Sequence, residues 1–131
     1  MAATQSEDVL FISIITLGEY DKAIYNLPND HPDRSRYIAA RDALEVRFQG
    51  RILSIDDSIV CQWGKISGEV KRLTGHPPSV IDSFLAASAI ENDLFLVTRN
   101  IKDVKHSGAA IFNPWSDDAS DFIITKKRES I

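Results

Sequence analysis

The residues of this chain that could do chemistry are acidic and amide side chains placed where helices begin and strands end. Asp82 stands at the start of a predicted helix over 80–91, and Asn100 and Asp103 follow a predicted strand over 94–98. A helix of about 12 residues rises roughly 18 Å and a strand of five residues spans about 16 Å, so the strand returns to the level of the helix start. We therefore expect Asp82, Asn100 and Asp103 to lie at one edge of a sheet and to suit a hard divalent cation.

Sheet topology adds a fourth residue to this edge. The apolar, β-branched run over 9–15 predicts a buried strand followed directly by a helix. Strands that alternate with helices predict a parallel α/β sheet, in which sites lie outside the carboxyl ends of the strands. This rule selects Glu19, which follows the first strand. Carboxylates gathered around Mg²⁺ or Mn²⁺ suit phosphodiester hydrolysis, whereas zinc is less well supported because the three histidines are scattered without ligand spacing.

Each of these acids also has a purely structural explanation. Three segments fit the spacing of a helix-capping box, namely Thr16 to Glu19, Ser79 to Asp82, and Asn100 to Asp103. Taken singly, each segment favours the cap. Convergence of all three at one edge favours the metal site, because caps do not require it, and one residue can serve both roles.

The remaining elements follow from apolar spacing and from helix-breaking residues. The first helix carries Leu17, Tyr20, Ile24 and Leu27 on one face and ends at Pro28. A second helix runs from Pro32 to about Phe48, with Gly50 after it, and a short strand covers 52–55. Asp56, Asp57 or Ser58 caps a third helix whose apolar face consists of Ile59, Trp63, Ile66, Val70 and Leu73. A last strand covers 110–112.

Composition sets limits on the class of protein. The 131 residues suffice for one domain, and 44% hydrophobic and 26% charged residues are ordinary for a globular protein. No apolar run approaches the length of a membrane span, the start lacks a signal peptide, and the single cysteine, Cys61, precludes an internal disulfide, so we expect a cytoplasmic protein. The net charge of −4 does not indicate a nucleic-acid binder. Near the predicted edge, Arg99 and Lys102 could hold a phosphate backbone, although solvated surface charge is the commoner role.

Several segments, in this order and spacing, resemble a known family. They are Phe-Ile-Ser-Ile-Ile-Thr-Leu-Gly-Glu (11–19), Phe-Gln-Gly-Arg-Ile-Leu-Ser-Ile-Asp (48–56), Val-Ile-Asp-Ser-Phe-Leu-Ala-Ala-Ser-Ala (80–89), Leu-Val-Thr-Arg-Asn-Ile-Lys-Asp (96–103) and Phe-Asn-Pro-Trp (112–115). The chain resembles the PIN-domain ribonucleases, specifically the VapC or FitB-like toxins of bacterial type II toxin–antitoxin modules. The resemblance implies a three-layer α/β fold, a mainly parallel sheet flanked by helices, over residues 1–115, with a tail over 116–131. It also implies Mg²⁺- or Mn²⁺-dependent cleavage of RNA, a homodimer, and a cognate antitoxin that inhibits the enzyme.

The resemblance assigns roles to individual residues. Glu19, Asp82, Asn100 and Asp103 match metal-binding positions, and Glu19, Asp82 and Asp103 are the catalytic candidates. Members of the family also open with a strand ending in Asp-Thr-Asn or Asp-Thr-Ser, which supplies a principal metal ligand and lies between the strands predicted at 9–15 and 94–98. This sequence does not show that strand. Three hypotheses result: an active endoribonuclease toxin, a catalytically inactive relative that still binds antitoxin or its own copy, and a plain α/β binding domain in which the acids are only caps.

Overall fold

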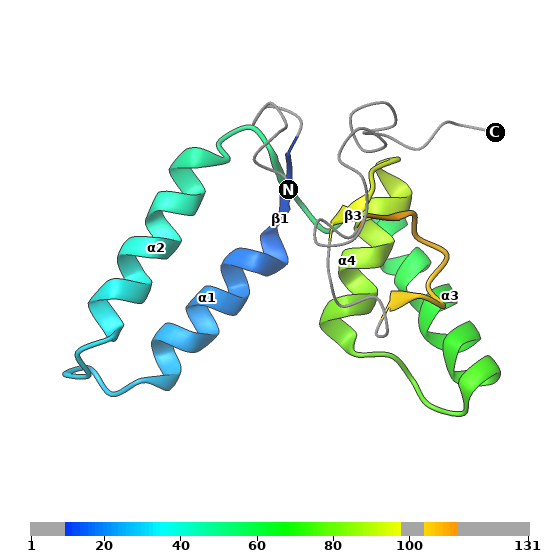
Figure 1. Cartoon of the computed structure of the whole chain (residues 1–131), viewed down its shortest axis with the longest axis horizontal. Helices are drawn as coiled ribbons and strands as arrows, with labels where there is room; N and C mark the ends of the chain where they lie inside the picture. Colours follow the sequence, from blue (N-terminus) through cyan, green and yellow to red (C-terminus); the bar gives the residue numbers. More distant parts are fainter. Residues whose placement is uncertain (1–9, 98–103, 113–131) are drawn as a thin grey trace. The chain divides into compact units, whose positions relative to one another are not determined.

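The computed structural model describes residues 10–97 and 104–112 of the chain, and these include four helices and four short strands (Figure 1). In chain order the elements are β1 (Ile12–Ser13), α1 (Ile14–Asn26), α2 (Arg34–Arg47), β2 (Ile52–Leu53), α3 (Asp57–Thr74), α4 (Val80–Glu91), β3 (Leu96–Val97) and β4 (Ile111–Phe112). The chain divides into two compact units. Residues 10–54 form the helical-hairpin unit, and residues 55–97 with 104–112 make up the described part of the α3–α4 unit.

The helical-hairpin unit begins with a shorter strand than the sequence predicts. Within the described part of the predicted strand, residues 10–15, β1 covers Ile12 and Ser13 and α1 starts at Ile14, so the predicted strand extends too far at its C-terminal end. The reason is a helix cap: the Ser13 hydroxyl accepts a hydrogen bond from the Ile15 N–H at 3.0 Å and satisfies a donor that the helix leaves unpaired. β1 pairs in parallel with β2, with Ile12 opposite Ile52.

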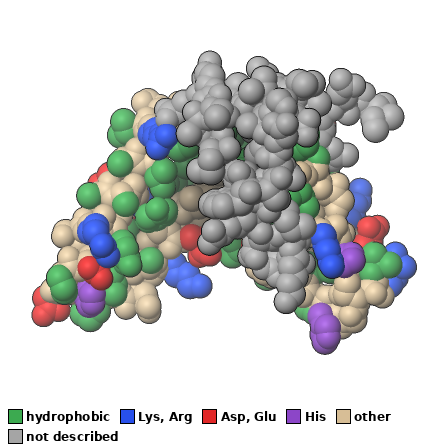
Figure 2. Space-filling view, in the orientation of Figure 1, with side chains coloured by type: hydrophobic (Ala, Val, Ile, Leu, Met, Phe, Trp, Pro, Cys, Tyr) green, Lys and Arg blue, Asp and Glu red, His purple; other side chains and the backbone are tan. Residues whose placement is uncertain are grey.

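Helices α1 and α2 lie side by side (Figure 1). Leu17 and Ile24 on α1 are buried as predicted, whereas no residue of α2 is fully buried. The helices are also joined by charge, because the Arg41 Nε of α2 donates to the Asp21 Oδ1 of α1 at 2.7 Å. The hydrogen bond to Asp21 raises the pKa of Arg41, and the nearby carboxylate of Glu45 raises it further. In the space-filling view, hydrophobic side chains are visible on the surface of this unit (Figure 2), and Tyr25 and Val46 are among the most exposed.

Helix α3 begins and ends as the sequence predicts. The Asp56 Oδ1 accepts from the Ile59 N–H at 3.0 Å, which makes Asp56 the N-cap, and Gly75 ends the helix with a left-handed φ of 86°. Ile59, Ile66 and Val70 are buried along its inner face. The predicted extension of this face to Leu73 is wrong: Leu73 lies in the last turn and is 63% exposed, so the buried face stops at Val70.

The α3–α4 unit contains a tightly packed helix pair. Ala86 and Ala87 of α4 are fully buried in the cluster formed with α3, since their small side chains let the two helices approach closely. Trp63 of α3 stacks on Phe84 of α4 with ring centroids 5.0 Å apart and an interplanar angle of 1°. The bounds of α4 agree with the predicted helix over 80–91.

The strands confirm the predicted α/β class with parallel pairing. β3 pairs in parallel with β4, with Leu96 opposite Ile111, just as β1 pairs with β2. Among the described residues the strands form two separate pairs, and no described strand joins β1 to β3. The predicted domain boundary near residue 115 and the tail over 116–131 lie outside the described residues. No helix in the described parts of the chain is both long and apolar enough to span a bilayer.

Candidate functional site

Asp82 lies in the first turn of α4, as predicted. Ser79 caps this helix, and its hydroxyl accepts a hydrogen bond from the Asp82 N–H at 3.3 Å. The predicted capping role of Ser79 is therefore confirmed. This bond uses the backbone N–H of Asp82 and not its carboxylate. The partial positive charge of the helix start favours a carboxylate at this position.

Glu19 lies further along its helix than the sequence predicts. Ser13, not Thr16, caps α1, and both Thr16 and Glu19 stand within the helix, so the predicted capping box from Thr16 to Glu19 is wrong. Ser13 takes the capping position because it directly precedes the first helical residue. The Glu19 side chain is exposed and borders a shallow hollow on α1 together with Lys22 and Tyr25. Because Glu19 does not take part in a helix cap, its exposed carboxylate could bind a ligand.

The remaining predicted site residues, Arg99, Asn100, Lys102 and Asp103, lie outside the described residues. Within the described ranges, no three His, Cys, Asp or Glu side chains are grouped so that they could hold a metal ion. Glu19 belongs to the helical-hairpin unit and Asp82 to the α3–α4 unit. Their convergence with Asn100 and Asp103 stays a prediction.

The donor chemistry of the two described acids fits a hard cation. Both offer carboxylate oxygens, the ligands that Mg²⁺ and Mn²⁺ prefer, and neither side chain is fully buried. Mg²⁺ retains several of its waters and takes few protein carboxylates, so each of these acids is of a suitable ligand type.

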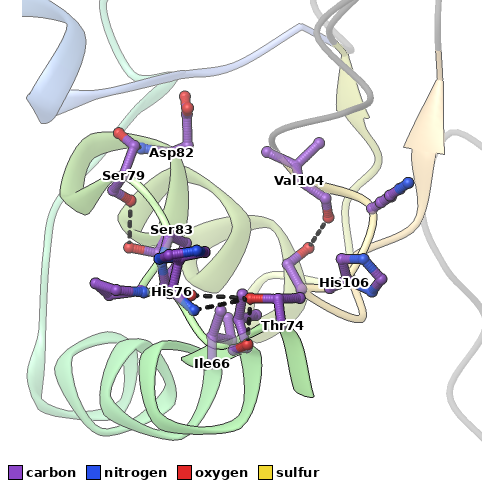
Figure 3. Close-up of a pocket in the computed structure, with 13 residues that line it drawn as sticks. Ile66, Thr74, His76, Ser79, Asp82, Ser83, Val104 and His106 are labelled. Carbon is purple, nitrogen blue, oxygen red and sulfur yellow. Dashed lines mark hydrogen bonds between the residues drawn. The ribbon is translucent and has the colours of Figure 1, made fainter. Parts of the chain in front are cut away.

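A cavity beside Asp82 is a feature that the sequence did not reveal. It has a volume of about 350 Å³ and lies between the end of α3, the loop that leads to α4, the start of α4 and the segment over 104–107 (Figure 3). His76 and His106, which are 30 positions apart, both line it. His76 lies in the loop between α3 and α4, and no spacing rule connects it with His106.

The chain is similar in sequence to two curated proteins. It is 28% identical over 111 residues to Toxin FitB of Neisseria gonorrhoeae, an alignment that covers 85% of this chain and 78% of the relative. It is 26% identical over 111 residues to plasmid stability protein StbB of Pseudomonas syringae pv. tomato, covering 85% of this chain and 79% of the relative. No profile of a known protein family matches the chain.

Solved structures show the same fold. FitAB bound to the IR36 DNA fragment superposes with a TM-score of 0.75 at 22% identity, covering 88% of this chain and 80% of that chain. VapBC-1 from nontypeable Haemophilus influenzae gives a TM-score of 0.65 at 23% identity, covering 82% of this chain and 75% of that chain. The fold is therefore an α/β fold of the PIN-domain class. More narrowly, the predicted resemblance to the FitB- and VapC-like toxins is confirmed.

Proposed function

We propose that this chain is the toxin component of a toxin–antitoxin module and acts as a metal-dependent endoribonuclease. The observation that carries the proposal is the combined similarity to Toxin FitB, in sequence over 85% of the chain and in fold to the FitAB complex. The location of Asp82 in the first turn of α4 supports the proposal, because a carboxylate is the type of ligand that a divalent cation uses in phosphodiester hydrolysis.

In the proposed reaction this chain contributes acidic oxygen ligands. Glu19 and Asp82 would hold Mg²⁺ or Mn²⁺ together with Asn100 and Asp103. A bound divalent cation supplies an activated water and neutralises charge on the phosphoryl oxygens. Arg99 and Lys102 would contact the phosphate backbone of the RNA and position it, as basic side chains commonly do.

The proposed partners are a cognate antitoxin protein and a second copy of the chain. The similar structures FitAB, FitAcB and VapBC-1, which are named as two-component complexes, support the proposal of an antitoxin partner. Binding of such a partner would inhibit the ribonuclease. Co-purification with the product of the adjacent gene, followed by mass measurement of the complex, tests both the antitoxin and the dimer.

The test of the activity is cleavage of labelled RNA by the purified chain with Mg²⁺, Mn²⁺ or EDTA. We expect cleavage that requires the metal, and loss of at least 100-fold in rate for Glu19→Gln and for Asp82→Asn, about 2.7 kcal/mol or more in barrier height. Glu69→Gln, at a surface acid of α3, is the control that should retain activity. Parent-like rates in both site variants would refute the assigned roles.

A second candidate function is an inactive relative that binds antitoxin or its own copy without cutting RNA. The observation in its favour is that the described strands form two pairs with no strand joining β1 to β3, the place where the resemblance implies a strand that carries a metal ligand. This hypothesis predicts weak divalent-ion binding by calorimetry and no cleavage. Robust metal-dependent cleavage by the 131-residue chain would eliminate it.

A further inference from the structure

The cavity beside Asp82 combines an apolar interior with a polar rim. Ile66, Val70 and Val104 are each at most 8% exposed and supply apolar lining, and Pro77 and Pro78 in the preceding loop add further apolar surface. Its volume of about 350 Å³ is at the small end of the roughly 300–1,000 Å³ typical of ligand pockets. The size and lining suit one small planar group rather than a long apolar chain.

The charge around the cavity differs from the charge of the whole chain. Lys105, His76 and His106 line it and are exposed, and Asp82 is the acidic residue in its lining. Histidine and basic side chains are visible at the surface of this unit (Figure 2). The chain as a whole carries a net charge of −4. The ammonium group of Lys105 can attract a phosphate, and the two imidazole rings offer faces on which a base can stack.

Three hydroxyl groups in the lining, those of Thr74, Ser83 and Ser107, are already used as donors. Ser83 donates to the Ser79 carbonyl at 2.7 Å, and Ser107 donates to the Val104 carbonyl at 2.6 Å (Figure 3). Thr74 is within donating distance of the Val70 carbonyl, at 2.7 Å. Because each hydroxyl has a single proton, these oxygen atoms can offer only acceptor positions to a ligand. Acceptors of this kind do not bind phosphate, but they suit the N–H groups at the edge of a nucleobase.

We propose that this cavity binds one nucleotide of the RNA substrate, with the base against the apolar lining and its phosphate toward Lys105 and His106. The inference rests on the proposed ribonuclease function and deepens it, because a base-binding cavity lined by Asp82 would help to choose the site of cleavage. A nucleotide accounts for the lining better than a base or a phosphate alone, because the lining offers apolar surface, acceptor oxygens and the Lys105 ammonium group together.

The first test measures binding without cleavage. The full chain in EDTA is titrated with the four nucleoside 5′-monophosphates, ribose 5-phosphate and inorganic phosphate, while NMR follows the imidazole signals of His76 and His106. We expect saturable shifts of both signals and at least tenfold tighter binding of a nucleoside monophosphate than of ribose 5-phosphate. His31, in the helical-hairpin unit, is the internal control and should not move. Equal binding of inorganic phosphate and nucleotides, or no shift at all, would overturn the proposal.

The second test separates the phosphate contact from general attraction. Binding of a fluorescent single-stranded RNA in EDTA is measured against salt for the parent, Lys105→Ala and the control Lys71→Ala, whose side chain is exposed on α3 and does not line the cavity. Loss of one phosphate contact should lower the slope of log affinity against log salt by about 0.7 for Lys105→Ala only. The same slope in both variants would overturn the phosphate contact.

These results are independent of the proposed activity. Nucleotide binding without any metal-dependent cleavage would retain the cavity as a nucleotide site and refute the ribonuclease. Cleavage with an unchanged pattern of products in His76→Ala and His106→Ala would retain the ribonuclease and refute the cavity as its base-binding site.

Discussion

The substitution Ile59→Ala tests whether the buried face of α3 supports α4, the helix that carries Asp82. Ile59 is 2% exposed and belongs to the cluster that includes Ala86 and Ala87 of α4. The change removes three buried carbons, which at about 0.8 kcal/mol each amounts to roughly 2.4 kcal/mol of lost transfer free energy. The cavity left behind adds to this, so we expect a loss of about 3 kcal/mol in the free energy of unfolding, within the range of roughly 2–5 kcal/mol for such changes.

The neighbouring residue provides the control for this substitution. Val60 is 44% exposed on the same helix, so Val60→Ala removes little buried surface. The better helix propensity of alanine offsets part of that loss, and we expect a net change within about 0.5 kcal/mol.

The assay is urea unfolding followed by the fluorescence of Trp63, in a background where Trp115→Phe removes the second tryptophan. Trp63 stacks on Phe84, so its signal reports on the α3–α4 pair. If Ile59→Ala and Val60→Ala shifted the midpoint equally, the inner face of α3 would not be the source of stability, and the packing argument would be refuted.

Three further predictions concern the caps and the charge pair. Asp56→Ala should lower the free energy of unfolding by about 1 kcal/mol in urea melts because it removes the α3 cap, whereas an asparagine at this position should preserve it. Gly75→Ala should destabilise the protein by about 1 kcal/mol or more, because φ is 86° at this position. Gly68→Ala, which has open space around its Cα inside α3, should stabilise it by up to about 1 kcal/mol in the same assay. If Gly75→Ala were the more stable of the two variants, the left-handed end of α3 at Gly75 would be contradicted. Asp21→Asn should lower the melting temperature at low salt through loss of the bond to Arg41, and the difference from the parent should shrink at about 1 M NaCl, where the screening length is roughly 3 Å. A difference independent of salt would argue against a charge contribution.

The sequence predicted helices better than strands. The helix over 80–91 and the Asp56 cap were predictable because a serine or aspartate before an apolar run satisfies free N–H groups by a purely local mechanism. The run over 9–15 was misread because short apolar segments fit a buried strand and a buried helix turn equally well. Ser13 within that run was the local signal for a helix start, and it also explains why Glu19 lies inside α1.

The candidate site was less predictable than the elements that carry it. Asp82 at a helix start follows from local sequence, whereas the meeting of His76 and His106 depends on how the α3–α4 unit folds back on itself. No periodicity joins residues 30 positions apart. Local patterns thus specify where a side chain stands on its own element, and tertiary packing decides which side chains share a cavity.

The absence of fully buried residues on α2 has a consequence for the dynamics of the chain. Helices held by few buried contacts open locally at a lower cost in free energy than helices that supply the core. Backbone amides of α2 should therefore exchange with deuterium well before those of α3 and α4, whose facing side chains are buried in one cluster. The helical hairpin would behave as a separate cooperative unit, and a protein partner that bound there would be detected first as slowed exchange in α2.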